Sequence, residues 1–206
     1  YAGEWSNRLC QGIAEACERY GCLLIGGDTV GSPDKISLTL TVIGEMQRGK
    51  VLYRHTAQPG DTIWVSGPLG RSAAGLALLQ AGGKQAMVER GEVEQILIKS
   101  HLDPQARTSL ATFLSELGVI HAMMDLSDGL ATDLAHICSR SRVGAELYAQ
   151  QLPGYEVLAP IADSLQQDPV TWMVAGGEDY ELLFTLPSRE NKRLQEKAVK
   201  AGYALY

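Results

Sequence analysis

Three short acidic motifs hold the residues of this chain that are best suited to chemistry. They are Gly-Gly-Asp-Thr at residues 26–29, Asp-Leu-Ser-Asp-Gly-Leu at residues 125–130 and Gly-Gly-Glu-Asp-Tyr at residues 176–180. Each motif adjoins an apolar run, and a run that stops at glycine and a carboxylate is typical of a buried strand that ends at a site. Because carboxylates repel one another, their gathering requires a cation, and Mg²⁺ with a phosphorylated substrate is the commonest case.

The second motif gives the strongest signal. Asp125 and Asp128 are three residues apart, so a first helical turn would place both on one side. A helix cap would explain Ser127 or Asp128 alone, but it leaves Asp125 without a role at the end of a strand. The motif therefore favours a metal or phosphate site, whereas Asp133 is expected to be solvated or to support the site indirectly.

The first and third motifs are weaker when each is taken alone. Gly27 beside Asp28 would allow the backbone to approach a phosphate closely, but a plain turn explains the same residues. Glu178 belongs to a stretch that would also suit a hairpin turn. Their interest comes from their likeness to the second motif, and we expect all three to meet in space.

Two further features have a functional and an ordinary interpretation. The glycine-rich loop at residues 67–70 leads from a strand into a helix, which suits anion binding at the helix N-terminus or close helix–sheet packing. It is not a phosphate-binding loop of the Walker type, since the Gly-Lys-Ser/Thr ending is absent. Arg54 could meet a phosphate or simply be solvated. No His-x-x-x-His pair supports zinc, and no Gly-x-Ser-x-Gly elbow supports acyl transfer.

Composition limits the class of protein. The 206 residues are 45% hydrophobic and 20% charged, with a net charge of −6, which fits one large or two small globular domains. No basic run stands out, so a nucleic-acid surface is not expected. No apolar stretch has the length of a membrane span and no signal peptide is evident, so we expect a cytoplasmic protein without membrane contact.

Helical and strand-like patterns alternate along the chain, which indicates an α/β or α+β class. Helices are predicted at residues 5–20, from the loop 67–70 to about 80, and at 93–100, 104–116, 129–141, 155–165 and 189–200. Strands are predicted at residues 22–25, 36–43, 62–66, 121–124, 143–148, 172–175 and 180–186.

The motifs, in their order and spacing, resemble those of thiamine-monophosphate kinases. The resemblance rests on residues 26–29, Arg54 before 57–61, and then 65–75, 124–130 and 176–182. These kinases belong to the superfamily of ATP-binding enzymes that resemble aminoimidazole-ribotide synthetase. The resemblance implies two α/β domains: residues 1–57 as the remainder of an N-terminal, dimer-forming, ATP-binding domain, and residues 58–206 as a C-terminal domain that is incomplete at its end.

The resemblance also implies an activity and a site. The activity is transfer of the ATP γ-phosphoryl group to thiamine monophosphate, in a homodimer with more than one Mg²⁺ ion. By the family pattern, Asp28, Asp125 and Asp128 match metal ligands, Gly27, Asp28, Arg54 and Ser127 match ATP contacts, and Glu178 matches a substrate contact. No side chain is expected to act as a catalytic acid or base, because alignment and metal ions would suffice.

Other readings remain open. A sister enzyme, such as an aminoimidazole-ribotide synthetase, a selenophosphate synthetase or a hydrogenase-maturation protein, would keep the superfamily and change the substrate. A non-catalytic nucleotide-binding domain would not need to keep Asp28, Asp125 and Asp128. The family's Asp-Asp-Ala-Ala-type motif is expected before Tyr1 and a substrate-facing aromatic residue after Tyr206, and His55 stands where a small residue is usual.

Overall fold

The computed structural model describes residues 3–82 and 91–206. By its internal contacts the chain divides into unit 1, Tyr1–Met46, and unit 2, Gln47–Tyr206. Each unit is described by itself. None of the helices in the described ranges is long and apolar enough to cross a membrane.

Unit 1 contains the helix α1 (Glu4–Tyr20), which confirms the helix predicted at residues 5–20. Leu9, Ile13 and Cys17 are half-buried and recur every three or four residues, so they form one stripe of the helix. The helix ends at Gly21, whose left-handed conformation (φ 65°) satisfies the last carbonyls. No described residue of unit 1 is fully buried.

The strands predicted at residues 22–25 and 36–43 are absent, because the described part of unit 1 has no strand. The alternation at 36–43 is real, but Leu40 is 75% exposed and no second segment pairs with this one. A strand is stable only beside another strand, so an alternating pattern without a partner leaves the backbone extended and unpaired.

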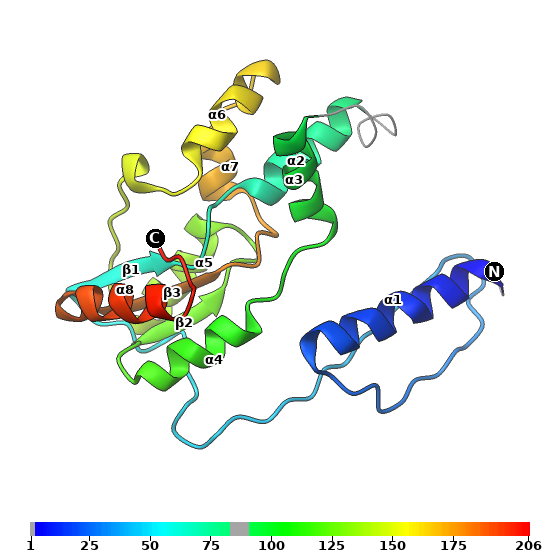
Figure 1. The fold of residues 1–206 in the computed structure, drawn as a ribbon, viewed down its shortest axis with the longest axis horizontal. Helices are drawn as coiled ribbons and strands as arrows, with labels where there is room; N and C mark the ends of the chain where they lie inside the picture. Colours follow the sequence, from blue (N-terminus) through cyan, green and yellow to red (C-terminus); the bar gives the residue numbers. More distant parts are fainter. Residues whose placement is uncertain (1–2, 83–90) are drawn as a thin grey trace. The chain divides into compact units, whose positions relative to one another are not determined.

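Unit 2 is built around a three-stranded antiparallel sheet in the order β1-β3-β2 (Figure 1). The strands are β1 (Asp61–Val65), β2 (Ala122–Asp125) and β3 (Leu182–Pro187). They confirm the strands predicted at 62–66, 121–124 and 180–186 to within one or two residues, the usual uncertainty of element ends. Phe184 of β3 lies opposite Trp64 on one side and Met123 on the other.

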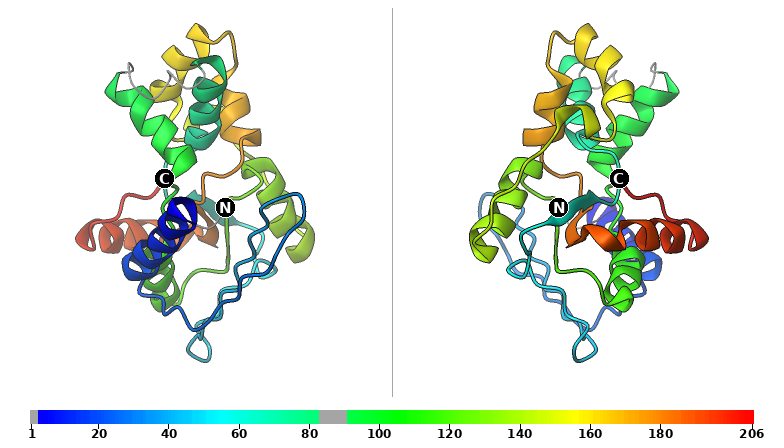
Figure 2. Two further views of the ribbon diagram at one scale, coloured as in Figure 1. Left: turned by 90° about the vertical axis from the view of Figure 1, so that its right-hand side faces the viewer. Right: turned by 90° about the vertical axis from the view of Figure 1, so that its left-hand side faces the viewer.

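Seven helices of the described residues surround this sheet. They are α2 (Arg71–Gly82), α3 (Glu92–Leu102), α4 (Thr108–Leu117), α5 (Leu130–Ser141), α6 (Tyr155–Ser164), α7 (Pro169–Ala175) and α8 (Asn191–Lys200), with single 3₁₀ turns at Ala149–Gln151 and Ser188–Glu190. Figures 1 and 2 show α4 and α8 on one face of the sheet, α5 on the other, and α2, α3, α6 and α7 gathered at one end of the unit.

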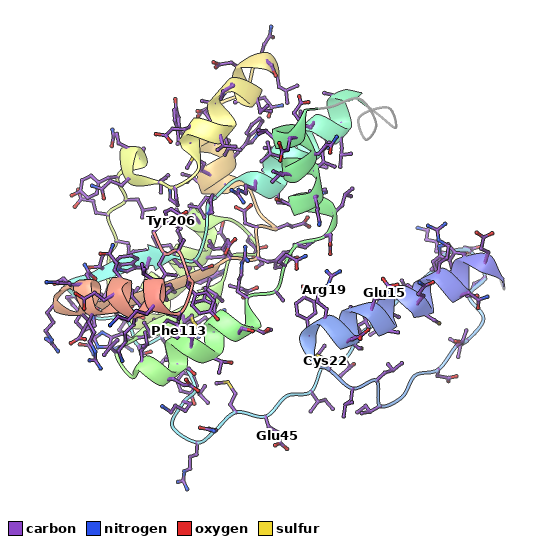
Figure 3. All side chains as sticks on the ribbon, in the orientation of Figure 1. Glu15, Arg19, Cys22, Glu45, Phe113 and Tyr206 are labelled. Carbon is purple, nitrogen blue, oxygen red and sulfur yellow. The ribbon has the colours of Figure 1, made fainter. Side chains whose placement is uncertain are left out.

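Alternate residues of the strands feed two cores. Trp64 and Phe184 join the cluster under α4 and α8, whereas Val65 and Leu183 join the larger cluster that includes α5 and the four gathered helices. Phe113 of α4, labelled in Figure 3, packs against the cluster under α4 and α8, and its ring lies tilted beside that of Tyr203, with 5.2 Å between the ring centroids. The two-residue period of the strands therefore places one sheet between two apolar layers.

Two predicted strands of unit 2 are also wrong. Residues 172–175 belong to helix α7, whose start carries a strong signal: the Asp168 carboxylate accepts the Val170 N–H, and Pro169 occupies the first turn. A short buried apolar run fits a helix as well as a strand, so the cap decides. Residues 143–148 form no strand and are exposed from Gly144 onward.

Candidate functional site

The topology of the sheet brings the second and third acidic motifs to the same edge. Asp125, the last residue of β2, lies opposite Leu182, the first residue of β3. Because the two strands are antiparallel, the segment that follows β2 and the segment that precedes β3 leave the sheet together. They contain residues 126–129 and 176–181, and we call them loop A and loop B.

Backbone hydrogen bonds join the two loops. The Leu126 N–H donates to Glu181 O (2.7 Å), the Tyr180 N–H donates to Leu126 O (2.9 Å), and the Glu178 N–H donates to Ser127 O (2.9 Å). The expectation that the acidic motifs meet in space is therefore confirmed for the second and third of them.

Two glycines allow this close approach. A Cβ atom on Gly177 would lie 2.6 Å from the Ser127 carbonyl oxygen, a distance that no real Cβ tolerates. Gly129 has a φ of 102° and passes so close to helix α7 that a Cβ would lie 3.0 Å from the carbonyl carbon of Ala175. Glycine is required at both positions because the backbones themselves are in contact.

Asp133 holds loop A in place from the first turns of α5. Its Oδ2 accepts the N–H groups of Ser127 (2.9 Å) and Asp128 (3.1 Å), and its side chain is fully buried. Burial raises the pKa of Asp133, the two backbone bonds lower it, and the nearby charges of Asp128 and Asp125 raise it further. The alternative that Asp133 is solvated is therefore wrong. The alternative that it supports the site indirectly is confirmed, since it holds the backbone of loop A.

The side chains that the two loops leave accessible are those expected to do chemistry. Asp125 and Asp128 are exposed, Ser127 is half-buried, and the Glu178 side chain is 57% exposed. Exposed carboxylates at one sheet edge are oxygen donors of the kind that Mg²⁺ prefers, so the residues present fit such an ion. Asp128, Asp133 and His136 also offer ligand atoms within 4.8 Å of one another.

Asp179 of loop B has a structural task that the sequence did not reveal. Its carboxylate accepts the N–H groups of Gly70 (2.6 Å) and Ser72 (3.0 Å) at the start of α2. The helix N-terminus that the sequence offered for anion binding is therefore occupied by the protein's own carboxylate. Desolvation raises the pKa of Asp179 to about 6, against the effect of these N–H groups and with a smaller contribution from the charge of Glu181.

Glu181, the next acid of loop B, is buried and paired. Arg107 grips both carboxylate oxygens, with its Nε 2.8 Å from Oε2, and the Ser66 hydroxyl donates to the same carboxylate. The Ser66 hydroxyl oxygen in turn accepts the Leu182 N–H (2.7 Å). A Cβ on Gly67 would collide with the carboxylate, so this glycine makes room for the ion pair. Sequence reasoning missed Arg107.

The side chains of loop B point alternately toward solvent and into the protein. Glu178 and Tyr180 have left-handed φ values of 65° and 50°, which cost energy for residues other than glycine. The side chains of Glu178 and Tyr180 are exposed, while the acids that follow each of them point into the protein. His101 lies beside Glu178, with 3.6 Å between Nδ1 and Oε2. Strain at an exposed acid of a candidate site is consistent with a functional demand on its position.

Arg54 does not join this site within unit 2. Its carbonyl oxygen accepts the Ser141 hydroxyl (3.4 Å) at the last residue of α5, whereas Ser127 precedes the first. Twelve helical residues span about 18 Å, so Arg54 and Ser127 lie at opposite ends of α5. The assignment of Arg54 to ATP stays a prediction.

Gly27 and Asp28 belong to unit 1, where both are exposed. The Asp28 carboxylate accepts the N–H of Thr29, the next residue in the chain (2.7 Å). A Cβ on Gly27 would meet nothing within 4 Å, so packing inside the described chain does not explain this glycine. The metal cluster shared by Asp28 with Asp125 and Asp128 stays a prediction.

Comparison with known proteins places the chain in a family. The model of the C-terminal domain of AIR synthase related proteins matches residues 58–205, and the model of their N-terminal domain matches residues 2–46. The chain belongs to the AIR synthase related family. The predicted fold class, an α/β or α+β fold of the two-domain aminoimidazole-ribotide-synthetase type, is thereby confirmed, and the antiparallel sheet of unit 2 is of the α+β kind.

Curated relatives sharpen the resemblance. The chain is 37% identical to the thiamine-monophosphate kinase of Haemophilus influenzae over 196 residues, which are 95% of this chain and 57% of the relative. It is 38% identical to that of Escherichia coli K12 over 183 residues, 89% of this chain and 54% of the relative. The similarity to thiamine-monophosphate kinases that the motifs predicted is confirmed, and the chain spans little more than half the length of these relatives.

Solved structures agree. The thiamine monophosphate kinase of Aquifex aeolicus matches with a TM-score of 0.72 at 31% identity, over 91% of this chain and 61% of that one. A structure described as AaThiL complexed with AMPPCP and TMP matches with a TM-score of 0.73, also at 31% identity, over 91% of this chain and 59% of that one.

Proposed function

We propose that the whole protein transfers the γ-phosphoryl group of ATP to thiamine monophosphate, which gives thiamine diphosphate and ADP. The observation that carries the proposal is the joined pair of loops A and B, which presents Ser127, Asp128 and Glu178 beside Asp125 of β2 at one sheet edge. A matched relative has been solved with AMPPCP and TMP, which supports both a nucleotide and this acceptor.

In this proposal Asp28, Asp125 and Asp128 would hold more than one Mg²⁺ ion. Bound Mg²⁺ supplies positive charge beside the phosphates and fixes their orientation. The donor set fits, since Asp125 and Asp128 are exposed carboxylates and loop A is fixed by the buried Asp133. Removal of divalent cations is therefore expected to abolish turnover.

Three further residues would bind the two substrates. The Ser127 hydroxyl and the backbone at Gly27 would contact ATP, with Arg54 as a further contact. Glu178 would face thiamine monophosphate, whose thiazolium ring is a cation that suits a carboxylate. Its left-handed backbone holds that carboxylate outside the buried set of acids.

The chemistry needs no strong base. The acceptor is a phosphate that is already anionic and nucleophilic at neutral pH, so alignment and charge stabilisation carry the reaction. Two of the four histidines are engaged within the fold: His121 with Asp61 (2.9 Å), and His101 with the Ser72 hydroxyl (3.0 Å). We assign no catalytic acid or base.

The association and compartment are also proposals. We propose a homodimer in the cytoplasm, with no nucleic-acid or membrane partner. The homodimer is supported by residues 36–43 of unit 1, whose alternating pattern suits a strand while both of its faces are exposed.

The test uses the full-length protein with ATP, Mg²⁺ and thiamine monophosphate, and chromatography follows thiamine diphosphate. Thiamine is the matched control acceptor because it lacks only the phosphate. Formation of thiamine diphosphate from thiamine monophosphate, and not from thiamine, supports the proposal. Product from another acceptor, with none from thiamine monophosphate, would move the protein to a sister enzyme of the same family.

A further inference from the structure

Asp133 leaves one oxygen unsatisfied at the centre of loop A. Its Oδ2 accepts two backbone N–H groups, but Oδ1 is buried and accepts no hydrogen bond from any residue in the described ranges. The whole residue is inaccessible to solvent. A buried carboxylate oxygen without a donor is costly, so we expect a ligand to satisfy it.

Two other ligand groups lie close to the Asp133 carboxylate. Asp133 and His136 are three residues apart on α5 and so share one helix face, and Asp128 reaches the same place from loop A. One ligand atom from each lies within 4.8 Å of the others. Apart from the bond of the Asp128 N–H to Asp133 Oδ2, no hydrogen bond or ion pair of the described residues joins the three. Asp128 and His136 are exposed, so their side chains can rotate toward the buried Asp133 carboxylate.

We propose that Asp128, Asp133 and His136 bind a divalent cation that accepts imidazole as well as carboxylate, such as Mn²⁺ or Zn²⁺. Ligand atoms about 2.0–2.2 Å from one such cation lie about 3–4 Å apart, so small rotations of the two exposed side chains complete the set. This site shares Asp128 with the proposed magnesium site. The imidazole distinguishes the two, since magnesium prefers oxygen ligands.

The cation would give loop A a second anchor. Asp133 would then bind the loop backbone through Oδ2 and the Asp128 side chain through the metal at Oδ1. This inference does not rest on the proposed kinase activity, because the three ligands belong to the chain itself and no nucleotide takes part.

The test is Mn²⁺ binding to the full-length protein without nucleotide, followed by pulsed electron paramagnetic resonance. The wild type should show coupling of bound Mn²⁺ to an imidazole nitrogen. His136→Ala should lose that coupling and bind Mn²⁺ roughly tenfold more weakly or worse, since even the outer partners of metal ligands contribute about that much. His136 is exposed, so the variant should fold.

Two controls separate this site from the magnesium site. His55→Ala removes another exposed histidine and should leave the signal unchanged, and Asp28→Asn should also leave the nitrogen coupling intact. An identical nitrogen signal in wild type and His136→Ala would overturn the inference. So would a wild type that binds Mn²⁺ without nitrogen coupling. Neither outcome depends on whether thiamine diphosphate is formed.

Discussion

The carboxylate of Asp179 lies 2.6 Å from the backbone nitrogen of Gly70, although 109 residues separate the two in the chain. The contact attaches loop B to the start of α2, and the third acidic motif thereby supports the fold as well as the candidate site. Desolvation raises the pKa of this carboxyl to about 6.

The raised pKa predicts a pH-dependent stability. The folded state holds the Asp179 proton more tightly than the unfolded state, so this group stabilises the fold below about pH 4 and the benefit is lost as pH rises to about 6. The full change is up to about 3 kcal/mol. Asp179→Asn should remove this component, which urea denaturation of both proteins between pH 4 and 7 would measure. Parallel stability profiles for the two proteins would contradict it.

Asp128→Asn should lower turnover of thiamine monophosphate sharply while the fold persists. Loss of a ligand charge beside a transferring phosphoryl group costs about 2–4 kcal/mol, by comparison with other preorganised electrostatic sites. Steady-state kinetics and thermal melting check the two halves. Asp163→Asn, an exposed aspartate on α6, is the matched control and should change neither. A variant that melts early and turns over normally would show that Asp128 serves the fold alone.

Arg107→Met should destabilise unit 2, because it leaves the buried Glu181 carboxylate without its cation. Arg107 is 38% exposed, so we expect about 2 kcal/mol, below the 3–5 kcal/mol found for fully buried pairs. Arg193→Met is the control, since its pair with Glu190 lies at the surface and should contribute less than about 1 kcal/mol. Urea denaturation would measure the free energy of unfolding of both variants. Equal losses for Arg107→Met and Arg193→Met would show that the burial of Glu181 does not matter.

Gly177→Ala should force loops A and B apart. The new Cβ would meet the Ser127 carbonyl at 2.6 Å, and backbone atoms cannot yield cheaply. We expect a loss of stability of about 1–3 kcal/mol together with a fall in activity. Gly144→Ala is the control, since its Cβ would meet nothing within 4 Å. Calorimetric melting and the turnover assay measure the two effects. A Gly177→Ala variant that melts and turns over like the wild type would refute the close contact between loops A and B.

Glu178→Asn should stabilise the protein and weaken substrate binding. Asparagine tolerates the left-handed backbone better than glutamate, so we expect a gain of about 0.5–1 kcal/mol. If Glu178 contacts thiamine monophosphate, KM for that substrate should rise while KM for ATP stays the same. A variant with a higher melting temperature and an unchanged KM would remove Glu178 from the substrate site.

The sequence predicted the sheet of unit 2 and most of its helices, because their patterns are local. Strands such as 180–186 combine an apolar run with turn residues at their ends, and that signal does not depend on the rest of the chain. The pattern at 172–175 failed because a four-residue apolar run does not distinguish strand from helix. The strand predicted at 36–43 is absent because a strand needs a partner strand, and periodicity does not say whether a partner is present.

The candidate site was predictable in part. Asp125 and Glu178 adjoin apolar runs, and their meeting follows from the antiparallel pairing of β2 with β3. The hydrogen bonds of Asp133, Asp179 and Arg107 could not be predicted from the sequence, because each depends on contacts that only the folded chain creates. Arg107 binds an acid 74 residues away, and no local pattern encodes that distance.

The alternating backbone of loop B has a consequence for protein engineering. The side chains of Asp179 and Glu181 hold the loop to the interior of the protein. The side chains of Glu178 and Tyr180 are exposed, so the fold depends less on them. If Glu178 contacts the substrate, specificity can be varied at these two positions while the neighbouring acids keep the loop in place. A library randomised at Glu178 and Tyr180 should retain a high proportion of folded members, while one randomised at Asp179 and Glu181 should consist mostly of unfolded chains.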